Sequence, residues 1–185
     1  MKQLINIPNI LTVIRILGAA SLLAFVPGSL WFIVIYTVAG ITDGLDGYIA
    51  RKTGKVTVFG AKLDSAADLL FYGVMLICIF PVLWQLLPWS IWVLVAVVIA
   101  VRLCAYLVVA VRFRRFSASH TWMNKTTGAF LFAVPYLIAT PVAVGYCWAV
   151  AVVALVASCE ELLIHLLKKQ YDGNTKTVLS LFTNK

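Results

Sequence analysis

Six long apolar segments, joined by short polar or proline-containing connections, constrain this chain more than any other feature of its sequence. An α-helix needs about 20 mostly apolar residues to cross the hydrocarbon core of a bilayer, and each segment is close to that length. We therefore predict six membrane-spanning helices, of which the fifth is the shortest. The predicted spans are Pro8–Val26, Leu30–Ala50, Gly60–Val82, Leu87–Val111, Asn124–Thr140 and Val142–Leu167.

The composition of the chain supports lipid as its solvent. Hydrophobic residues make up 63% of the sequence and charged residues only 12%, whereas about a quarter of the residues in a soluble domain are charged. We expect an all-α integral membrane bundle over residues 1–170, followed by a polar cytoplasmic tail over residues 171–185. The segment Met1–Ile7 is predicted to lie flat at the membrane surface, because apolar and polar residues interleave along it.

Lysine and arginine are distributed asymmetrically along the chain. The connections at Pro27–Ser29, Pro81–Ser90 and Thr140–Tyr146 contain neither residue, whereas the alternate connections and both ends are basic. By the positive-inside rule, the basic regions face the cytoplasm. We therefore expect a multi-pass protein of the cell membrane with both termini and its chemistry on the cytoplasmic side. The net charge of +8 follows from this topology and from attraction to anionic lipid headgroups, so no nucleic-acid partner is predicted.

Four of the seven acidic residues lie within 26 positions, at the facing ends of the second and third spans: Asp43, Asp46, Asp64 and Asp68. A carboxylate at membrane depth costs about 2.5–3.5 kcal/mol on insertion scales, and four together repel one another unless a cation lies among them. The spacings of three and four residues put each pair on one helix face. The short loop Lys52–Phe59 makes the two helices antiparallel neighbours, so the two pairs are expected to meet.

The predicted donor set consists of oxygen atoms alone, with no histidine or cysteine nearby. Such a set favours a hard cation such as Mg²⁺, Mn²⁺ or Ca²⁺ over zinc. Four carboxylates can hold two ions about 3.5–4 Å apart, an arrangement suited to a phosphoryl group in transfer. We therefore predict a site for Mg²⁺ or Mn²⁺, with two ions.

Small residues lie one helical turn from the predicted carboxylates: Gly47, Ala50 and Gly60. Their small side chains leave room for a bulky ligand, although close packing between helices is the alternative explanation. Arg51 follows directly and offers a planar cationic fork suited to a phosphate. Together with the aspartates, this pattern favours clearance for a ligand.

Eight residues of this region form a fixed pattern, D-x-x-D-G-x-x-A-R, eight further residues, then G-x-x-x-D-x-x-x-D. They are Asp43, Asp46, Gly47, Ala50, Arg51, Gly60, Asp64 and Asp68. The pattern resembles the signature of the CDP-alcohol phosphotransferase family, and the layout of six spans extends the resemblance to most of the chain. The resemblance implies an enzyme that transfers a phosphatidyl group from CDP-diacylglycerol to a small polar alcohol, releases CMP and forms a homodimer.

The resemblance also implies a role for each matching residue. Asp43, Asp46 and Asp64 are expected to bind metal, and Asp68 is expected to be a ligand or the general base for the acceptor hydroxyl. The residues expected to line the CDP site are Gly47, Ala50, Arg51 and Gly60. The start of the first span resembles the family as well.

Three residues of that first span are candidate contacts of the nucleotide or its phosphates: Asn9, Thr12 and Arg15. Two of them have a simpler alternative explanation. Asn9 follows Pro8 and can cap a helix, and the long side chain of Arg15 can extend to the interface.

Basic residues outside the signature are the candidates for the acceptor site: Arg102, Arg112 and Lys125. Arg102 lies within the fourth span, where an arginine calls for an anionic partner; a pairing with one of the aspartates is the alternative. Arg112 belongs to a basic cluster that also serves as a topology signal. These cations favour a phosphorylated acceptor, and glycerol 3-phosphate is our preferred one.

Some sequence segments favour glycerol 3-phosphate as the acceptor, and others favour serine. The segments at 6–9 and 125–127 resemble phosphatidylglycerophosphate synthases. Those enzymes have proline and a basic residue where this chain has Ser65 and Leu69, and the segment at 63–68 looks more like phosphatidylserine synthases. Serine and an inositol phosphate therefore stay open as acceptors. We expect Glu161 and His165, four residues apart near the end of the last span, to be structural.

A divalent-cation transporter is the alternative from another class, since intramembrane carboxylates can line an ion path. A transporter is expected to distribute its carboxylates through the membrane and to contain discontinuous helices. Here the carboxylates gather at one side, beside Arg51, whose charge repels a permeating cation. The sequence therefore favours the enzyme.

Overall fold

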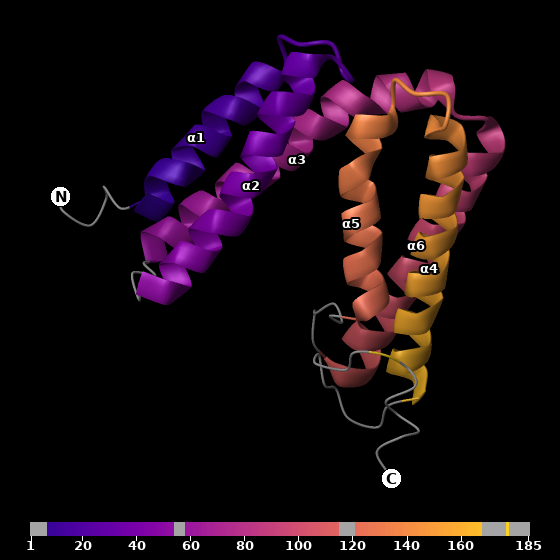
Figure 1. Ribbon diagram of the computed structural model, residues 1–185. Coiled ribbons are helices and arrows are strands. Elements are labelled where there is room, and N and C mark those ends of the chain that lie inside the picture. The colour runs from indigo at the N-terminus through magenta and orange to yellow at the C-terminus, as the bar shows by residue number, and fades with distance from the viewer. Residues whose placement is uncertain (1–6, 54–57, 115–120, 168–176, 178–185) are drawn as a thin grey trace. The chain divides into compact units, whose positions relative to one another are not determined.

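The structure is a computed structural model that describes residues 7–53, 58–114, 121–167 and 177 (Figure 1). Within these ranges it does not describe the side chains of residues 7–9, 44, 46–51, 53, 58, 59 and 61. The described part consists of helices joined by short turns, which confirms the predicted all-α class. The helices are α1 (Ile7–Leu22), α2 (Leu30–Thr53), α3 (Val58–Leu86), α4 (Trp89–Phe113), α5 (Trp122–Leu137) and α6 (Ala143–Leu167).

Each predicted span corresponds to one helix, but several predicted ends are wrong by a few residues. The third span continues past Val82 to Leu86, with Pro81 inside α3. A proline removes one backbone donor, and in membrane helices this loss is tolerated when neighbouring groups satisfy the freed carbonyl. The fifth span begins earlier than predicted, at Trp122, because the hydroxyl of Thr121 accepts a hydrogen bond from the backbone N–H of Asn124 and caps α5.

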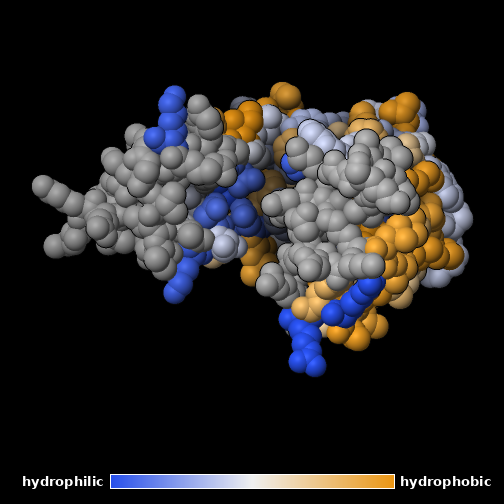
Figure 2. Space-filling model, turned by 90° about the horizontal axis from the view of Figure 1, so that it is seen from below, coloured by the Kyte–Doolittle hydropathy of each residue, from blue (hydrophilic) through white to orange (hydrophobic). Residues whose placement is uncertain are grey.

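Large apolar side chains on the outside of the helices indicate a membrane environment. Leu69 and Val111 are 78% and 73% exposed, and many other leucine, valine and isoleucine side chains are exposed with them. Figure 2 shows broad orange, hydrophobic areas on the visible surface. Three described segments are long and apolar enough to cross a bilayer, and they are Lys62–Leu86, Trp89–Phe113 and Ala143–Leu167. Such apolar outer surfaces fit lipid better than water.

The chain divides into two compact units, Met1–Gln85 and Leu86–Lys185. In the first unit, α1 packs against α2, and the two are joined by a turn in which Gly28 has a positive φ of 84°. This backbone conformation carries no steric cost for glycine. The rings of Tyr36 and Phe71 stack 5.7 Å apart and join α2 to α3. The packing brings α1, α2 and α3 together around one core.

In the second unit, α6 contacts both α4 and α5. Its buried face carries small and apolar residues, among them Ala151 and Ala157, but also Glu161 and His165. The hydroxyl of Tyr146 donates a hydrogen bond of 2.9 Å to the carbonyl of Phe130 and fastens α6 to α5. The unit therefore buries an acidic residue and a histidine within its three-helix core.

Candidate functional site

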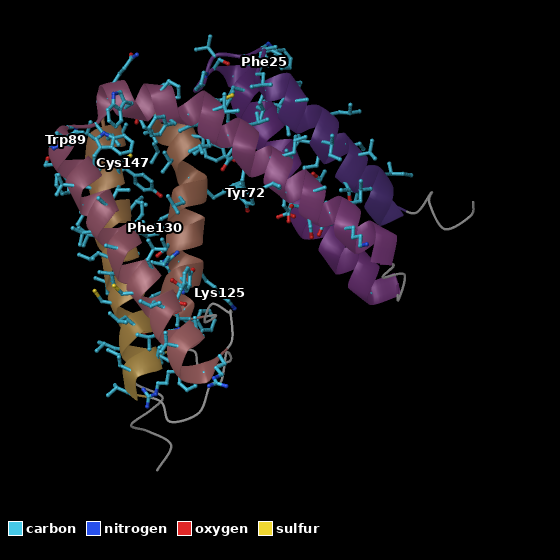
Figure 3. All side chains as sticks on the ribbon, turned by 180° about the vertical axis from the view of Figure 1, so that it is seen from behind. Phe25, Tyr72, Trp89, Lys125, Phe130 and Cys147 are labelled. Atoms are coloured by element: carbon cyan, nitrogen blue, oxygen red, sulfur yellow. The ribbon has the colours of Figure 1, made fainter. Side chains whose placement is uncertain are left out.

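Three aspartates of α2 and α3 form a carboxylate cluster. Asp43, Asp64 and Asp68 each contribute one oxygen atom to a group in which all of these atoms lie within 4.8 Å of one another. Asp64 and Asp68 share a face of α3 because they are one turn apart, and α2 presents Asp43 to them. Figure 3 shows red oxygen atoms gathered on the first unit, near the labelled Tyr72 of α3. The structure thus brings together three of the four aspartates singled out in the sequence.

The carboxylate cluster is held together by Arg15 of α1. The Nη1 atom of Arg15 lies 3.0 Å from Oδ1 of Asp43, 3.0 Å from Oδ1 of Asp64 and 2.6 Å from Oδ1 of Asp68. The Arg15 side chain is only 1% exposed, so it does not extend to the interface, and that alternative is wrong. A guanidinium in contact with three carboxylates offsets the repulsion between them.

The carboxylate cluster is open on the side away from Arg15. The side chains of Asp43, Asp64 and Asp68 are 49%, 41% and 39% exposed, respectively. If all three are ionised, the single charge of Arg15 leaves the described part of the cluster with a net negative charge of two. Oxygen donors with an excess negative charge suit a hard divalent cation. The residues present therefore fit Mg²⁺ or Mn²⁺, and an ion can reach them from solvent.

Arg15 and a divalent ion compete for the same oxygen atoms. Mg²⁺ and Ca²⁺ bind oxygen at about 2.0–2.6 Å, whereas Nη1 of Arg15 already lies within 3.0 Å of the three Oδ1 atoms. An ion bound to these atoms from the open side would lie close to Nη1, and the two positive charges would repel. The charge of Arg15 therefore weakens the binding of a metal ion to the cluster.

The other candidate residues of this unit are only partly described. Thr12 is buried and lies one turn before Arg15 on α1, and Gly60 is half-buried, one turn before Asp64 on α3. The remaining candidates have side chains outside the described residues, and they are Asn9, Asp46, Gly47, Ala50 and Arg51.

Arg102 of α4 takes part in a partly buried polar network of the second unit. Its Nη2 atom donates a hydrogen bond of 2.8 Å to Oδ1 of Asn124 on α5. The side-chain amide of Asn124 donates in turn to Oε2 of Glu161 on α6, at 3.0 Å. Within its own unit, Arg102 thus has the side-chain amide of Asn124 as a partner.

Sequence reasoning missed the role of Glu161 in this network. Glu161 is fully buried, and its Oε1 atom lies 3.8 Å from Nε2 of the buried His165. A carboxylate within an apolar span needs hydrogen-bond partners. This requirement could have indicated from the sequence that Glu161 has a polar partner. The spacing within one helix, however, could not show that the partner comes from α5.

The other two candidate acceptor residues differ in their surroundings. Nη1 of Arg112 donates to the carbonyls of His165 and Leu166, at 3.2 Å and 2.6 Å, and so satisfies the end of α6. Lys125 is exposed, with its Nζ atom 5.3 Å from the centre of the Trp122 ring. Arg112 thus has a structural partner, whereas Lys125 faces the surroundings.

Together these observations define a helical membrane protein with a carboxylate cluster suited to a divalent cation. The chain belongs to the CDP-alcohol phosphatidyltransferase family, whose model matches residues 5–159. This membership confirms the predicted class of enzyme, a phosphotransferase of phospholipid synthesis.

Individual relatives differ in the acceptor that their names specify. A CDP-diacylglycerol–glycerol-3-phosphate 3-phosphatidyltransferase of Pseudomonas fluorescens is 33% identical over 144 residues, which cover 74% of this chain and 73% of the relative. A CDP-diacylglycerol–serine O-phosphatidyltransferase of Methanocaldococcus jannaschii is 43% identical over 74 residues, 40% of this chain and 34% of the relative. A CMP-forming cardiolipin synthase of Oryza sativa is 36% identical over 106 residues, 54% of this chain and 32% of the relative. No solved structure matches the chain.

Proposed function

We propose that this protein transfers a phosphatidyl group from CDP-diacylglycerol to glycerol 3-phosphate and releases CMP. The observation that carries the proposal is the carboxylate cluster of Asp43, Asp64 and Asp68, gathered on helices that carry the family signature. The acceptor rests on the names of several relatives, including the one aligned over three quarters of the chain. Serine is the second candidate, supported by Ser65 and Leu69 and by the archaeal relative.

The first step is to hold the diphosphate of the lipid substrate. Asp43, Asp46, Asp64 and Asp68 are the residues that would bind Mg²⁺ or Mn²⁺, as two ions. Bound ions of this kind offset the charge that develops on the diphosphate when CMP leaves. Residues of the first three helices would contact the CDP part, and they are Asn9, Thr12, Arg15, Gly47, Ala50, Arg51 and Gly60.

The chemical step is a displacement at the lipid-side phosphorus. The acceptor hydroxyl oxygen forms a bond to that phosphorus, the bond to the CMP phosphate breaks, and Asp68 takes the proton of the hydroxyl. The contribution of the protein is positioning and charge stabilisation, as in other phosphoryl transfers. Arg102, Arg112 and Lys125 are the proposed contacts of the acceptor.

The proposed setting is the cell membrane, with both termini and the site on the cytoplasmic side and with a homodimer as the assembly. The basic connections of the sequence support this orientation. Half-exposed carboxylates on helices with apolar outer surfaces suit a substrate whose headgroup is polar and whose tails are in lipid. Family membership supports CDP-diacylglycerol as the donor.

The test is a CMP-release assay with purified protein, CDP-diacylglycerol, Mn²⁺ and three acceptors: glycerol 3-phosphate, serine and an inositol phosphate. We expect release with glycerol 3-phosphate at least about tenfold faster than with the others, because a matched acceptor is discriminated by its transition-state contacts. CMP release with serine alone would show that serine, and not glycerol 3-phosphate, is the acceptor. If no acceptor causes CMP release and the protein carries Mn²⁺ into liposomes, a divalent-cation transporter would be favoured over the enzyme.

Arg15→Met is expected to tighten Mn²⁺ binding by at least about tenfold, because the competing cation is removed from the three carboxylates. Isothermal titration of chelator-treated protein measures the affinity directly. The melting temperature should also rise more on addition of Mn²⁺ than in the unaltered protein, because an ion that binds only the folded state stabilises it.

Lys125→Met is the matched control, since it removes an exposed cation outside the carboxylate cluster. We expect this variant to bind Mn²⁺ with the affinity of the unaltered protein. Unchanged or weaker Mn²⁺ binding by Arg15→Met would contradict the competition between Arg15 and the ion.

A further inference from the structure

Asn124 lies between the cation of Arg102 and the carboxylate of Glu161. Its Oδ1 atom accepts from Arg102 at 2.8 Å, and its Nδ2 atom donates to Glu161 at 3.0 Å. The carboxylate is thus one side chain away from the guanidinium. The three residues come from α4, α5 and α6, so the network crosses the core of the second unit.

The chemistry of the two neighbours fixes the orientation of the Asn124 amide. Arginine has only donors and an ionised glutamate has only acceptors, so the oxygen must face Arg102 and the NH₂ must face Glu161. The backbone N–H of Asn124 is held by Oγ1 of Thr121 at 3.1 Å, which places the residue in the first turn of α5. An amide is the group that can satisfy both neighbours without adding a charge.

Arg102 retains binding capacity beyond Asn124. A guanidinium has five N–H donors, and the described residues supply an acceptor for Nη2. The Nε atom of Arg102 is buried and has no acceptor among the described residues. A buried donor without an acceptor is rare in folded proteins, and a bidentate anion is the ligand that a guanidinium binds best. The side chain is half-buried, so part of it stays accessible.

We propose that Asn124 is a specificity-determining residue. It separates the Glu161 carboxylate from Arg102, so that the positive charge of the guanidinium stays available for the phosphate of the acceptor. The proposal rests on the proposed function, namely on an acceptor that carries a phosphate. Coulombic attraction falls with distance, so a carboxylate beyond an amide neutralises Arg102 less than one in direct contact. Arg102 binds the phosphate, and Asn124 acts through Arg102 as a positioning residue.

The test moves the carboxylate without changing the total charge. In the double variant Asn124→Asp, Glu161→Gln, the aspartate accepts from Arg102 and from the new glutamine amide, so the chain of hydrogen bonds is preserved with its charge relocated. We expect the KM for glycerol 3-phosphate to rise at least about tenfold and kcat to change much less, as for the loss of a ground-state anion contact. The KM for CDP-diacylglycerol should stay the same, and the melting temperature should be close to that of the unaltered protein.

Two single variants complete the test. Glu161→Gln removes the carboxylate and keeps the acceptor for Asn124, so the KM for glycerol 3-phosphate should fall at least about twofold. Glu160→Gln is the matched control on the same helix, because Oε1 of Glu160 accepts a hydrogen bond from Thr177, and we expect no change in this KM. If the double variant does not fold, a KM in Glu161→Gln that rises or stays constant overturns the proposal.

The outcomes separate the inference from the proposed function. If the unaltered protein releases CMP with glycerol 3-phosphate, and the folded double variant has an unchanged KM for it, Asn124 does not set the affinity and the inference is wrong. If the unaltered protein releases CMP with serine alone, the proposed acceptor is wrong, and the inference falls with the phosphate on which it rests. A rise in the KM of the double variant that is confined to glycerol 3-phosphate supports both the proposed function and the inference about Asn124.

Discussion

Asp68→Asn is expected to lower the turnover of CMP release by roughly 10²–10⁴-fold, because an amide cannot take the proton of the acceptor hydroxyl. The amide oxygen can still accept a hydrogen bond from Nη1 of Arg15, which lies 2.6 Å from Oδ1 of Asp68. The variant should therefore fold with a melting temperature near that of the unaltered protein. CMP release under saturating substrates measures the effect, and Glu160→Gln controls for the loss of a carboxylate elsewhere.

Mn²⁺ affinity separates the two roles proposed for Asp68. If Asp68 acts as the base alone, Asp68→Asn should bind Mn²⁺ as the unaltered protein does, with turnover lost. If it is also a ligand, the affinity should fall together with turnover. Turnover close to that of the unaltered protein would remove Asp68 from the base role.

Removal of divalent ions is expected to reduce CMP release to background, and addition of Mg²⁺ or Mn²⁺ should restore it. The reason is the charge of the carboxylate cluster, which Arg15 offsets only in part and which would repel a diphosphate. Treatment with a chelator followed by titration with each ion measures the effect. A rise in melting temperature with Mn²⁺ is an independent readout, since a ligand of the folded state stabilises it.

Asp64→Asn gives the matched test at a single ligand. It should weaken Mn²⁺ binding and raise the Mn²⁺ concentration needed for half-maximal CMP release, because one charged oxygen donor is replaced by a neutral one. Glu160→Gln, which removes a carboxylate outside the cluster, should leave the Mn²⁺ requirement as it is. Full activity in chelator-treated protein would contradict the requirement for metal.

The helices were predictable from sequence because a bilayer leaves few alternatives to a continuous apolar helix. Their ends were less predictable, since they depend on single residues. Thr121 starts α5 before the predicted position, and α3 continues through Pro81. A proline is a strong stop signal in water, but it is weaker in a helix surrounded by other helices and lipid.

The convergence of Asp43 with Asp64 and Asp68 follows from local rules, namely spacing on a helix face and a short loop. The place of Arg15 does not follow from them, because the rotation of α1 about its axis is set by packing. Ala19 and Leu22 are fully buried in that packing, and they carry Arg15 to the inside of the unit. A contact that depends on how two helices pack is not visible in the spacing of either one.

The Asn124 network was hidden for a similar reason. The spacing of Glu161 and His165 predicts a structural pair on one helix, but the residue that connects Glu161 to Arg102 comes from α5. Sequence spacing finds neighbours within a helix. It does not show that Asn124 on α5 forms hydrogen bonds with charged residues on two other helices, α4 and α6.

Asp68 and Leu69 are consecutive residues with opposite surroundings. Asp68 joins the carboxylate cluster, while the side chain of Leu69 is 78% exposed. One peptide bond therefore separates the carboxylate cluster from a surface that hydrocarbon chains can cover. A two-tailed donor can approach such a centre sideways within its own leaflet, so that only its headgroup changes environment during a catalytic cycle.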